Sequence, residues 1–163
     1  MSKNLLENKM FKKQAKIGEL IKKMSARDYA LYLISLSMQS TEILKQKLAR
    51  KGYEHGGINE VIQSLTELGY INDEQLAQMY FENLKKYKKC GYFGVKRKLI
   101  EKKFNSKLIE KLLKSYLEKE ETEIAKNFLE AKKNKTPEQQ IRMLQNRGFR
   151  GDVIMKVVKL KDF

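Results

Sequence analysis

The chain of 163 residues has little of several residue types on which common protein classes depend: it contains one proline, one cysteine, one histidine and no tryptophan. So few prolines exclude a collagen-like chain or a Pro/Gly-rich disordered one. No apolar run approaches the roughly 18 residues that a membrane span needs. Because no apolar signal core follows Met1 either, we expect a cytoplasmic protein without a membrane partner.

The scarcity of histidine and cysteine also restricts the chemistry that the chain can perform. Cys90 has no second cysteine to pair with, which fits a reducing compartment. One imidazole and one thiol are too few ligands for a zinc site, and His55 lies in a turn without an evident nucleophile or orienting acid. The Gly-Tyr-Phe-Gly run at 91–94 lacks the lysine and hydroxyl residue of a phosphate-binding loop. We therefore expect no catalytic residue, no metal and no cofactor.

Positive charge is what the sequence does have, and it is concentrated. The 35 Lys and Arg residues exceed the 20 Asp and Glu residues, which gives a formal net charge of +15. Segment 85–103 alone holds nine bases against a single acid, Glu101, with Tyr87, Tyr92 and Phe93 interleaved. Such a segment can be a solvated charged face. Because its like charges repel one another and one acid cannot offset nine bases, a polyanionic partner is the simpler explanation.

The composition of this segment favours contacts to phosphates. Lysine outnumbers arginine in it, which suits backbone contacts better than bidentate recognition of bases. An aromatic side chain in the same segment can stack on an exposed base, although it can also pack inside the protein. We predict a surface that binds DNA or a nucleoprotein filament, formed by Lys85, Lys86, Lys88, Lys89, Tyr92, Lys96, Arg97, Lys98, Lys102 and Lys103.

An internal repeat organises the rest of the chain. Three blocks align with one another when they begin at residues 40, 91 and 136, which are 51 and 45 residues apart. Each block carries a leucine followed five positions later by an aromatic residue: Leu48 and Tyr53, Leu99 and Phe104, Leu144 and Phe149. Apolar residues three or four apart predict helices in and around each block, and nothing alternates with the period of a strand.

The repeat predicts an all-α fold, an elongated and curved array of three tandem three-helix repeats resembling helix-turn-helix units. We assign a basic N-terminal extension to 1–24 and the three repeats to 25–71, 72–118 and 119–163. A repeat of about 45 residues buries little apolar surface alone, so neighbouring repeats should dock and share a core.

Two positions break the pattern of the repeat. Gly52, and Gly148 after the basic turn that ends in Arg147, are expected to cap helices in a left-handed conformation. Lys103 replaces this glycine in the middle block, so we expect a different cap there. Gln140 occupies a place that is apolar in the other two blocks, so the apolar stripe is expected to slip in the third.

The repeat cores closely resemble the RecX family, the bacterial regulators of the RecA recombinase. The most specific part is the run Leu-Gly-Tyr-Ile-Asn-Asp at 68–73, which follows the Lys-Gly-Tyr turn at 51–53. Further matches are Ala30-Leu31, Leu76-Ala77 and the pair Lys88 and Gly91, and the resemblance covers 25–163. It implies three tandem three-helix repeats, in agreement with the repeat found above.

The resemblance also implies a non-enzymatic modulator, and we expect it to be a monomer. Members of the family bind the RecA filament on single-stranded DNA, usually suppress its ATPase and strand exchange, and in some cases bind DNA directly, so double-stranded DNA stays open as a partner. Many relatives have arginines just before the first repeat block, where this chain has Ser37 and Gln39. A contact made by those arginines cannot be carried over to this sequence.

Two alternatives remain open at this point. The first is a non-specific DNA-binding helical-repeat protein that acts without a recombinase partner, whose affinity would fall steeply with salt. The second is an enzyme acting on nucleic acid, which needs clustered carboxylates or histidines with a metal ion, and no adequate cluster is present. The sequence leaves open whether a recombinase would be inhibited or activated. It also leaves open whether single-stranded or double-stranded DNA is preferred.

Overall fold

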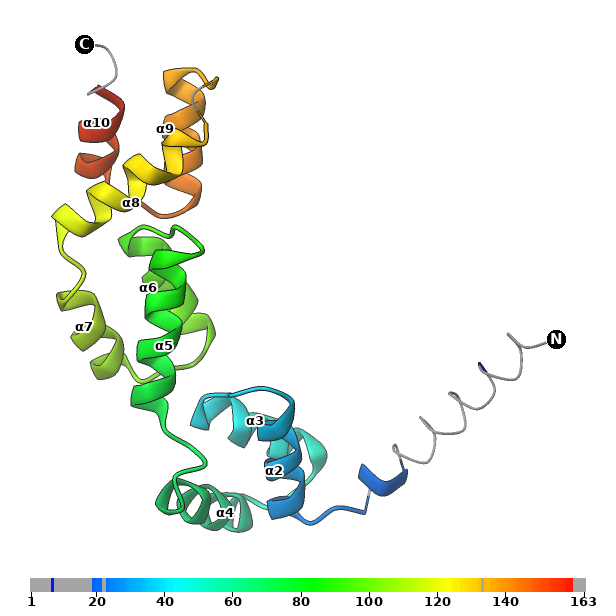
Figure 1. The fold of residues 1–163 in the computed structure, drawn as a ribbon. Helices are drawn as coiled ribbons and strands as arrows, with labels where there is room; N and C mark the ends of the chain where they lie inside the picture. The colour runs from blue at the N-terminus through cyan, green and yellow to red at the C-terminus, as the bar shows by residue number, and fades with distance from the viewer. Residues whose placement is uncertain (1–6, 8–18, 22, 133, 160–163) are drawn as a thin grey trace. The chain divides into compact units, whose positions relative to one another are not determined.

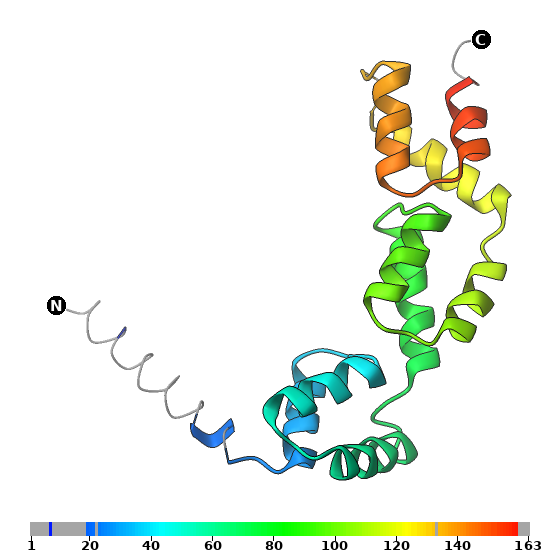
Figure 2. The same ribbon diagram turned by 180° about the vertical axis from the view of Figure 1, so that it is seen from behind.

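The computed structural model describes residues 7, 19–21, 23–132 and 134–159, which form α-helices without any strand among them (Figures 1 and 2). The helices of this part are α2 (Ala26–Leu36), α3 (Thr41–Lys51), α4 (His55–Glu67), α5 (Asp73–Lys86), α6 (Tyr92–Glu101), α7 (Ser106–Lys114), α8 (Glu118–Glu130), α9 (Pro137–Asn146) and α10 (Gly151–Lys159). None of the helices among the described residues could cross a bilayer. Most of the predicted extension 1–24 lies outside the described residues.

The predicted repeat of three helices is confirmed. The central helices α3, α6 and α9 begin at 41, 92 and 137, which preserves the spacing of the three sequence blocks. The aligned leucines Leu48, Leu99 and Leu144 are all fully buried. Local signals set the helix ends, as at α9, where Thr136 forms a capping box with Gln139 and Pro137 occupies the first turn.

The chain divides into two compact units. The first comprises Met1–Gln39 and Ile43–Ile71, and the second comprises Ser40–Glu42 and Asn72–Phe163. Both repeats predicted at 72–118 and 119–163 thus lie inside one unit, and the boundary between them stays a prediction. In the first unit, α2, α3 and α4 enclose a core that includes Leu44, Leu48 and Leu65.

The second unit contains two apolar clusters. One lies among α5, α6 and α7 around Phe81 and Leu99, and the other lies among α8, α9 and α10 around Leu129 and Leu144. Helix α10 contacts both α8 and α9, as both ribbon views show. Ile124 of α8 is partly buried against both clusters, so the two repeats share it at the edge of their cores.

The two expected breaks in the repeat are corrected by the structure. Lys103 has φ +59°, the same left-handed conformation as Gly52 at +96° and Gly148 at +73°, so the middle block keeps the cap despite its side chain. A left-handed non-glycine residue costs roughly 1–2 kcal/mol. Gln140 is buried at its aligned position rather than displaced, because its amide donates a hydrogen bond to the Lys135 carbonyl at 2.9 Å. The stripe therefore does not slip.

A close backbone contact joins the start of α6 to the turn between α9 and α10. The N–H of Gly91 donates to the Arg147 carbonyl at 3.1 Å, and the N–H of Phe93 donates to the Gly148 carbonyl at 2.8 Å. A Cβ on Gly94 would lie 2.1 Å from the Arg147 carbonyl oxygen, and one on Gly148 would lie 2.1 Å from the Gly94 nitrogen. The glycines at 91–94 thus serve close approach between two repeats.

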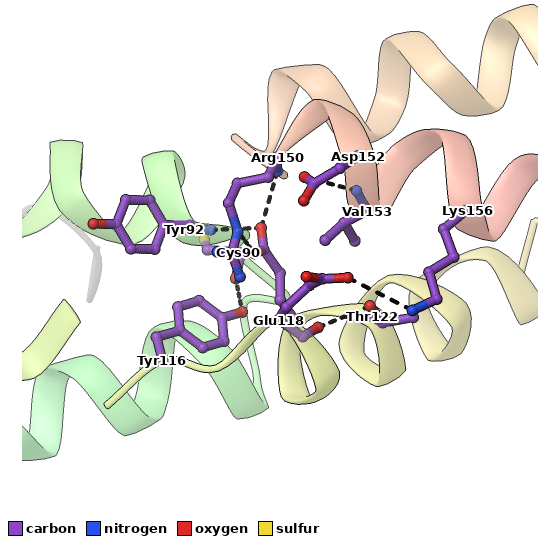
Figure 3. Close-up of polar contacts among 10 residues, drawn as sticks. Cys90, Tyr92, Tyr116, Glu118, Thr122, Arg150, Asp152, Val153 and Lys156 are labelled. Atoms are coloured by element: carbon purple, nitrogen blue, oxygen red, sulfur yellow. Dashed lines mark hydrogen bonds and ion pairs between the residues drawn. The ribbon is translucent and has the colours of Figure 1, made fainter. Parts of the chain in front are cut away.

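A buried carboxylate reinforces the same junction. Glu121 of α8 is fully buried, and its Oε1 accepts hydrogen bonds from the N–H of Tyr92 at 2.9 Å and the N–H of Arg150 at 3.0 Å. Its Oε2 accepts from Arg150 Nε at 2.5 Å. Tyr92 and Arg150 approach from α6 and from the start of α10 (Figure 3). One side chain therefore ties together the N-termini of two helices from different repeats, where a negative charge is favoured.

Tyr116 supplies a third, phenolic link inside the second unit. Its hydroxyl donates to the Cys90 carbonyl at 2.8 Å (Figure 3), and its ring meets Phe81 edge-on at 5.9 Å between centroids. Burial, followed by the nearby Glu121 and Glu120 carboxylates, raises the pKa of the Tyr116 phenol well above 10. The folded protein thus holds the phenol proton after the unfolded chain has released it.

Tyr116→Phe should therefore lower stability at neutral pH and make it less sensitive to alkali. The lost hydrogen bond should cost about 1 kcal/mol at pH 7. Because the folded pKa is raised, the contribution of this phenol is complete below pH 10 and declines by roughly 1.4 kcal/mol per pH unit above it. Denaturant unfolding should show that the difference in free energy of unfolding between the wild-type protein and Tyr116→Phe is smaller at pH 11 than at pH 7. Tyr87→Phe, at an exposed tyrosine, is the control, and its free energy of unfolding should stay close to that of the wild-type protein at both pH values.

Candidate nucleic-acid interface

Most of the predicted cations lie at the surface where α5 ends and α6 runs. The exposed ones are Lys86, Lys88, Lys96, Arg97, Lys102 and Lys103, and the half-buried ones are Lys89 and Lys98. Lys89 sits at φ +50° in the connection between the two helices. The charge counted along the sequence is thus largely accessible, although it does not all face the same way.

Lys85 differs from the others because it lies in the interior. Its side chain is 8% exposed, and its Nζ lies 2.8 Å from Glu120 Oε1 and 3.1 Å from Glu82 Oε1. The ammonium also lies 4.3 Å from the centroid of the Phe81 ring. A cation held in this way links α5 to α8 and cannot reach a polyanion, so we remove Lys85 from the candidate interface.

Tyr92 has an internal role as well. It is half-buried, and its ring packs edge-on against Phe93 at 5.4 Å and beneath the Arg150 guanidinium at 5.2 Å. Its backbone N–H is one of the donors to Glu121. Phe93, which is 55% exposed, is the ring of this pair that is open to solvent. A base stacking on this surface would meet Phe93 before Tyr92.

A cleft gathers part of the charge at one place. This basic cleft has a volume of about 380 Å³ and lies among α5, α6 and the end of α9. Four cations line it: Lys88, Arg97, Lys98 and Arg147. Tyr80, Asn83 and Asn146 add a phenol and two amides, and Cys90 is also at its wall. None of the lining residues, all of which are described, is acidic.

The two arginines of the basic cleft are held by backbone carbonyls. Arg97 Nη2 donates to the Asn146 carbonyl at 3.5 Å, and Arg147 Nη1 donates to the Lys88 carbonyl. The Arg147 guanidinium also stacks 4.3 Å from the Phe128 ring centroid. Each arginine thus reaches across from its own repeat to the other, and Arg147, which has two such contacts, is positioned before any ligand arrives.

The surroundings of the basic cleft change the pKa of Cys90. This thiol is buried, and burial raises its pKa, while the positive charges of Arg147, Lys98, Arg97 and Lys88 act in the opposite direction. Because burial is the larger effect, the thiol is protonated at neutral pH, when it is a weak nucleophile. The structure thus gives the cysteine a place in the wall of the cleft rather than a reactive position.

Lys96 faces a different groove. That groove, of about 290 Å³, lies between α6 and α7 and is lined by both apolar and polar residues, among them Ile109, Leu113, Glu110 and Lys114. The neighbouring residues Lys96 and Arg97 therefore carry the same charge on separate surfaces. Charge counting along the chain cannot distinguish them.

Arg147 and Asn146, which complete the basic cleft, lie outside the segment that the charge pattern predicts. The basic turn before Gly148 was the available signal, and we assigned it only to the helix cap. The turn lies against the start of α6, about 50 residues earlier, through the glycine contacts described above. No pattern in the sequence indicates this contact.

Comparisons with known proteins agree on one family. Residues 26–65 match the family model for the first three-helix domain of RecX. The chain is 30% identical over 146 residues to the regulatory protein RecX of Caldanaerobacter subterraneus subsp. tengcongensis, covering 86% of this chain and 72% of that relative. It is 28% identical to the regulatory protein RecX of Chlorobaculum tepidum, covering 85% and 89%.

Solved structures have the same fold. The crystal structure of RecX from Lactobacillus salivarius superposes with a TM-score of 0.73 at 21% identity, covering 84% of this chain and 94% of that one. A second crystal structure of a regulatory protein RecX gives a TM-score of 0.68 at 18% identity. Sequence identity, extent of coverage and fold thus lead to one conclusion: the chain belongs to the RecX family of regulatory proteins.

Proposed function

We propose that this protein binds the RecA recombinase filament on single-stranded DNA and modulates it, most plainly by inhibiting its ATPase and strand exchange. It would thereby regulate recombinational DNA repair in the cytoplasm. Membership of a family whose relatives carry the name regulatory protein RecX is the observation that carries this proposal. The net charge of +15 supports it, since a filament on DNA is a polyanion.

The mechanism that we propose is physical rather than catalytic. The second unit is held together by backbone contacts and a buried carboxylate, so it can act as a rigid body against more than one recombinase protomer. A ligand that favours one conformation of its partner shifts the equilibrium toward that conformation. Bridging adjacent protomers would therefore oppose the subunit changes that accompany ATP turnover.

The test is the ATPase rate of the recombinase on single-stranded DNA with increasing amounts of this protein. We expect the rate to fall to a plateau at saturation, because each bound molecule holds the protomers that it bridges. A rate that stays unchanged at saturation contradicts the proposal.

A charge-reversed variant separates this function from plain DNA binding. Lys96→Glu, Arg97→Glu and Lys98→Glu together change the net charge by six. A matched control reverses Lys107, Lys114 and Lys119, which are exposed residues. Under the proposal, the first variant loses binding to free DNA but still associates with the recombinase through protein contacts. If it loses both while the control keeps both, the chain is a DNA-binding protein that acts without a recombinase partner.

A further inference from the structure

We propose that the basic cleft among α5, α6 and α9 is a discrete site for a run of neighbouring phosphate groups. A single polynucleotide strand and a free polyphosphate both present such a run, and the experiment below separates them. The inference deepens the proposed function. It rests on that function for one point, that the occupant of the cleft in the cell is a polynucleotide strand. It goes further because it names one cleft, built by two repeats, in place of a basic surface.

Charge is the first observation that carries the inference. Lys88, Arg97, Lys98 and Arg147 line one cavity of about 380 Å³, which as a sphere would be roughly 9 Å across, close to the Debye length of ~8 Å at physiological ionic strength. Their repulsion is therefore only partly screened. In the described residues, only Lys98 of these four has an ion pair, at 3.8 Å to Glu101. An anion in the cleft supplies the charge that the protein lacks there.

The donors fit phosphate oxygens in particular. Two guanidinium groups offer paired N–H donors, which match phosphate oxygens in geometry, and the two lysines add point charges. The amides of Asn83 and Asn146 and the hydroxyl of Tyr80 can bond to ester or sugar oxygens at the same wall. A carboxylate ligand would use the guanidinium groups but would leave most of the other donors unpaired.

Preorganisation is the second observation. Arg147 is held by the Lys88 carbonyl and the Phe128 ring, and Arg97 makes a longer contact of 3.5 Å with the Asn146 carbonyl. Long cationic side chains on a merely solvated face move freely and lose that freedom when a ligand binds. Here part of that ordering cost is met by folding, because the Arg147 side chain already has two contacts and its backbone is bonded to the start of α6.

The sharpest test compares two neighbouring residues of equal charge. Arg97 lines the basic cleft, whereas Lys96 lines the groove between α6 and α7. Purified Arg97→Glu and Lys96→Glu proteins have almost the same net charge, so a diffuse field would weaken both alike. Binding of a fluorescent single-stranded oligothymidine, without recombinase and at physiological salt, is measured by anisotropy. We expect Arg97→Glu to lose about tenfold or more in affinity and Lys96→Glu to lose roughly threefold or less.

Lys98→Glu is the second cleft variant, and it should behave like Arg97→Glu if both are folded by circular dichroism. Inorganic tripolyphosphate, added as competitor, identifies the source of the phosphates. Displacement of the strand at similar concentrations of phosphate groups assigns the cleft to free polyphosphates as well, and displacement only at large excess assigns it to a strand. Equal losses in the Lys96 and Arg97 variants overturn the inference.

The inference and the proposed function can fail separately. If the wild-type protein lowers recombinase ATPase while the Lys96 and Arg97 variants bind oligothymidine equally, the function stands and the cleft is not a site. If the cleft variants lose the strand but the wild-type protein leaves the ATPase unchanged, the cleft stands and the recombinase function fails.

Discussion

Gly148→Ala should destabilise the second unit by about 3–5 kcal/mol, one of the two largest effects expected of a single substitution in this chain. Gly148 has φ +73°, a conformation that alanine adopts only with strain. Its new Cβ would also lie 2.1 Å from the Gly94 nitrogen and 2.6 Å from the Gly94 Cα. Both are backbone atoms, so the clash could be relieved only by moving the backbone of α6 or of the turn. Hydrogen exchange of the α6, α9 and α10 amides measures the loss directly, since it resolves the two units.

Gly52→Ala is the matched control for this substitution. Gly52 holds the equivalent cap position in the first repeat at φ +96°, but nothing lies within 4 Å of its would-be Cβ. It should therefore cost only the left-handed strain, about 1–2 kcal/mol, confined to the first unit. Equal losses from the two substitutions would show that backbone conformation alone matters and that the close contact at Gly94 contributes nothing.

The contrast between these two glycines shows what sequence could predict. The helices and most of their caps follow from patterns within about ten residues, such as the Thr-Pro-Glu start of α9. The repeat follows from comparing such patterns along the chain. The left-handed cap at Gly148 is local in the same way. Its contact with Gly94 is not local, because no pattern in the Gly-Tyr-Phe-Gly run indicates which backbone will lie against it.

The candidate site divides along the same line. Counting charge found the segment 85–103, and most of its cations do lie at the surface. It also included Lys85, because the count could show Glu82 one turn away but not Glu120, which is 35 residues later and folds over the ammonium. Arg147 was missed for the converse reason. Its charge belongs to a turn of the third repeat and joins the basic cleft only when two repeats dock.

Docking of the two repeats therefore links stability to the phosphate site that we propose. The contacts that hold α6 against the α9–α10 turn include the backbone of Arg147, and so they place this residue beside the helix that carries Arg97. A substitution that loosens this junction should weaken phosphate binding even if it leaves every cation in place. Lys103, which keeps its left-handed cap without glycine, shows that the fold accepts strain at a cap position.

Glu121→Ala tests this link with the second large effect. Removing the carboxylate leaves the N–H groups of Tyr92 and Arg150 and the Arg150 guanidinium without their shared acceptor. Loss of one partner of a buried, hydrogen-bonded charge pair typically costs 3–5 kcal/mol. Because the Arg150 side chain is 27% exposed, we expect the lower end of this range, about 3 kcal/mol, in the free energy of unfolding. Denaturant unfolding followed by circular dichroism measures it, and oligothymidine affinity should fall as well although no cation has been changed.

Glu123→Ala is the control on the same helix. Glu123 is exposed and pairs with Lys126 at 3.0 Å, so its removal should cost no more than about 1 kcal/mol and, with the same change in charge, leave strand affinity unchanged or slightly higher. Glu121→Gln keeps an oxygen that can accept from two of the three donors but turns amide hydrogens toward Arg150, so its stability should lie between those of the alanine variants. If Glu121→Ala were as stable as Glu123→Ala and bound the strand equally well, the other contacts between the two repeats would be sufficient to hold them together. The cleft would then not depend on the buried carboxylate.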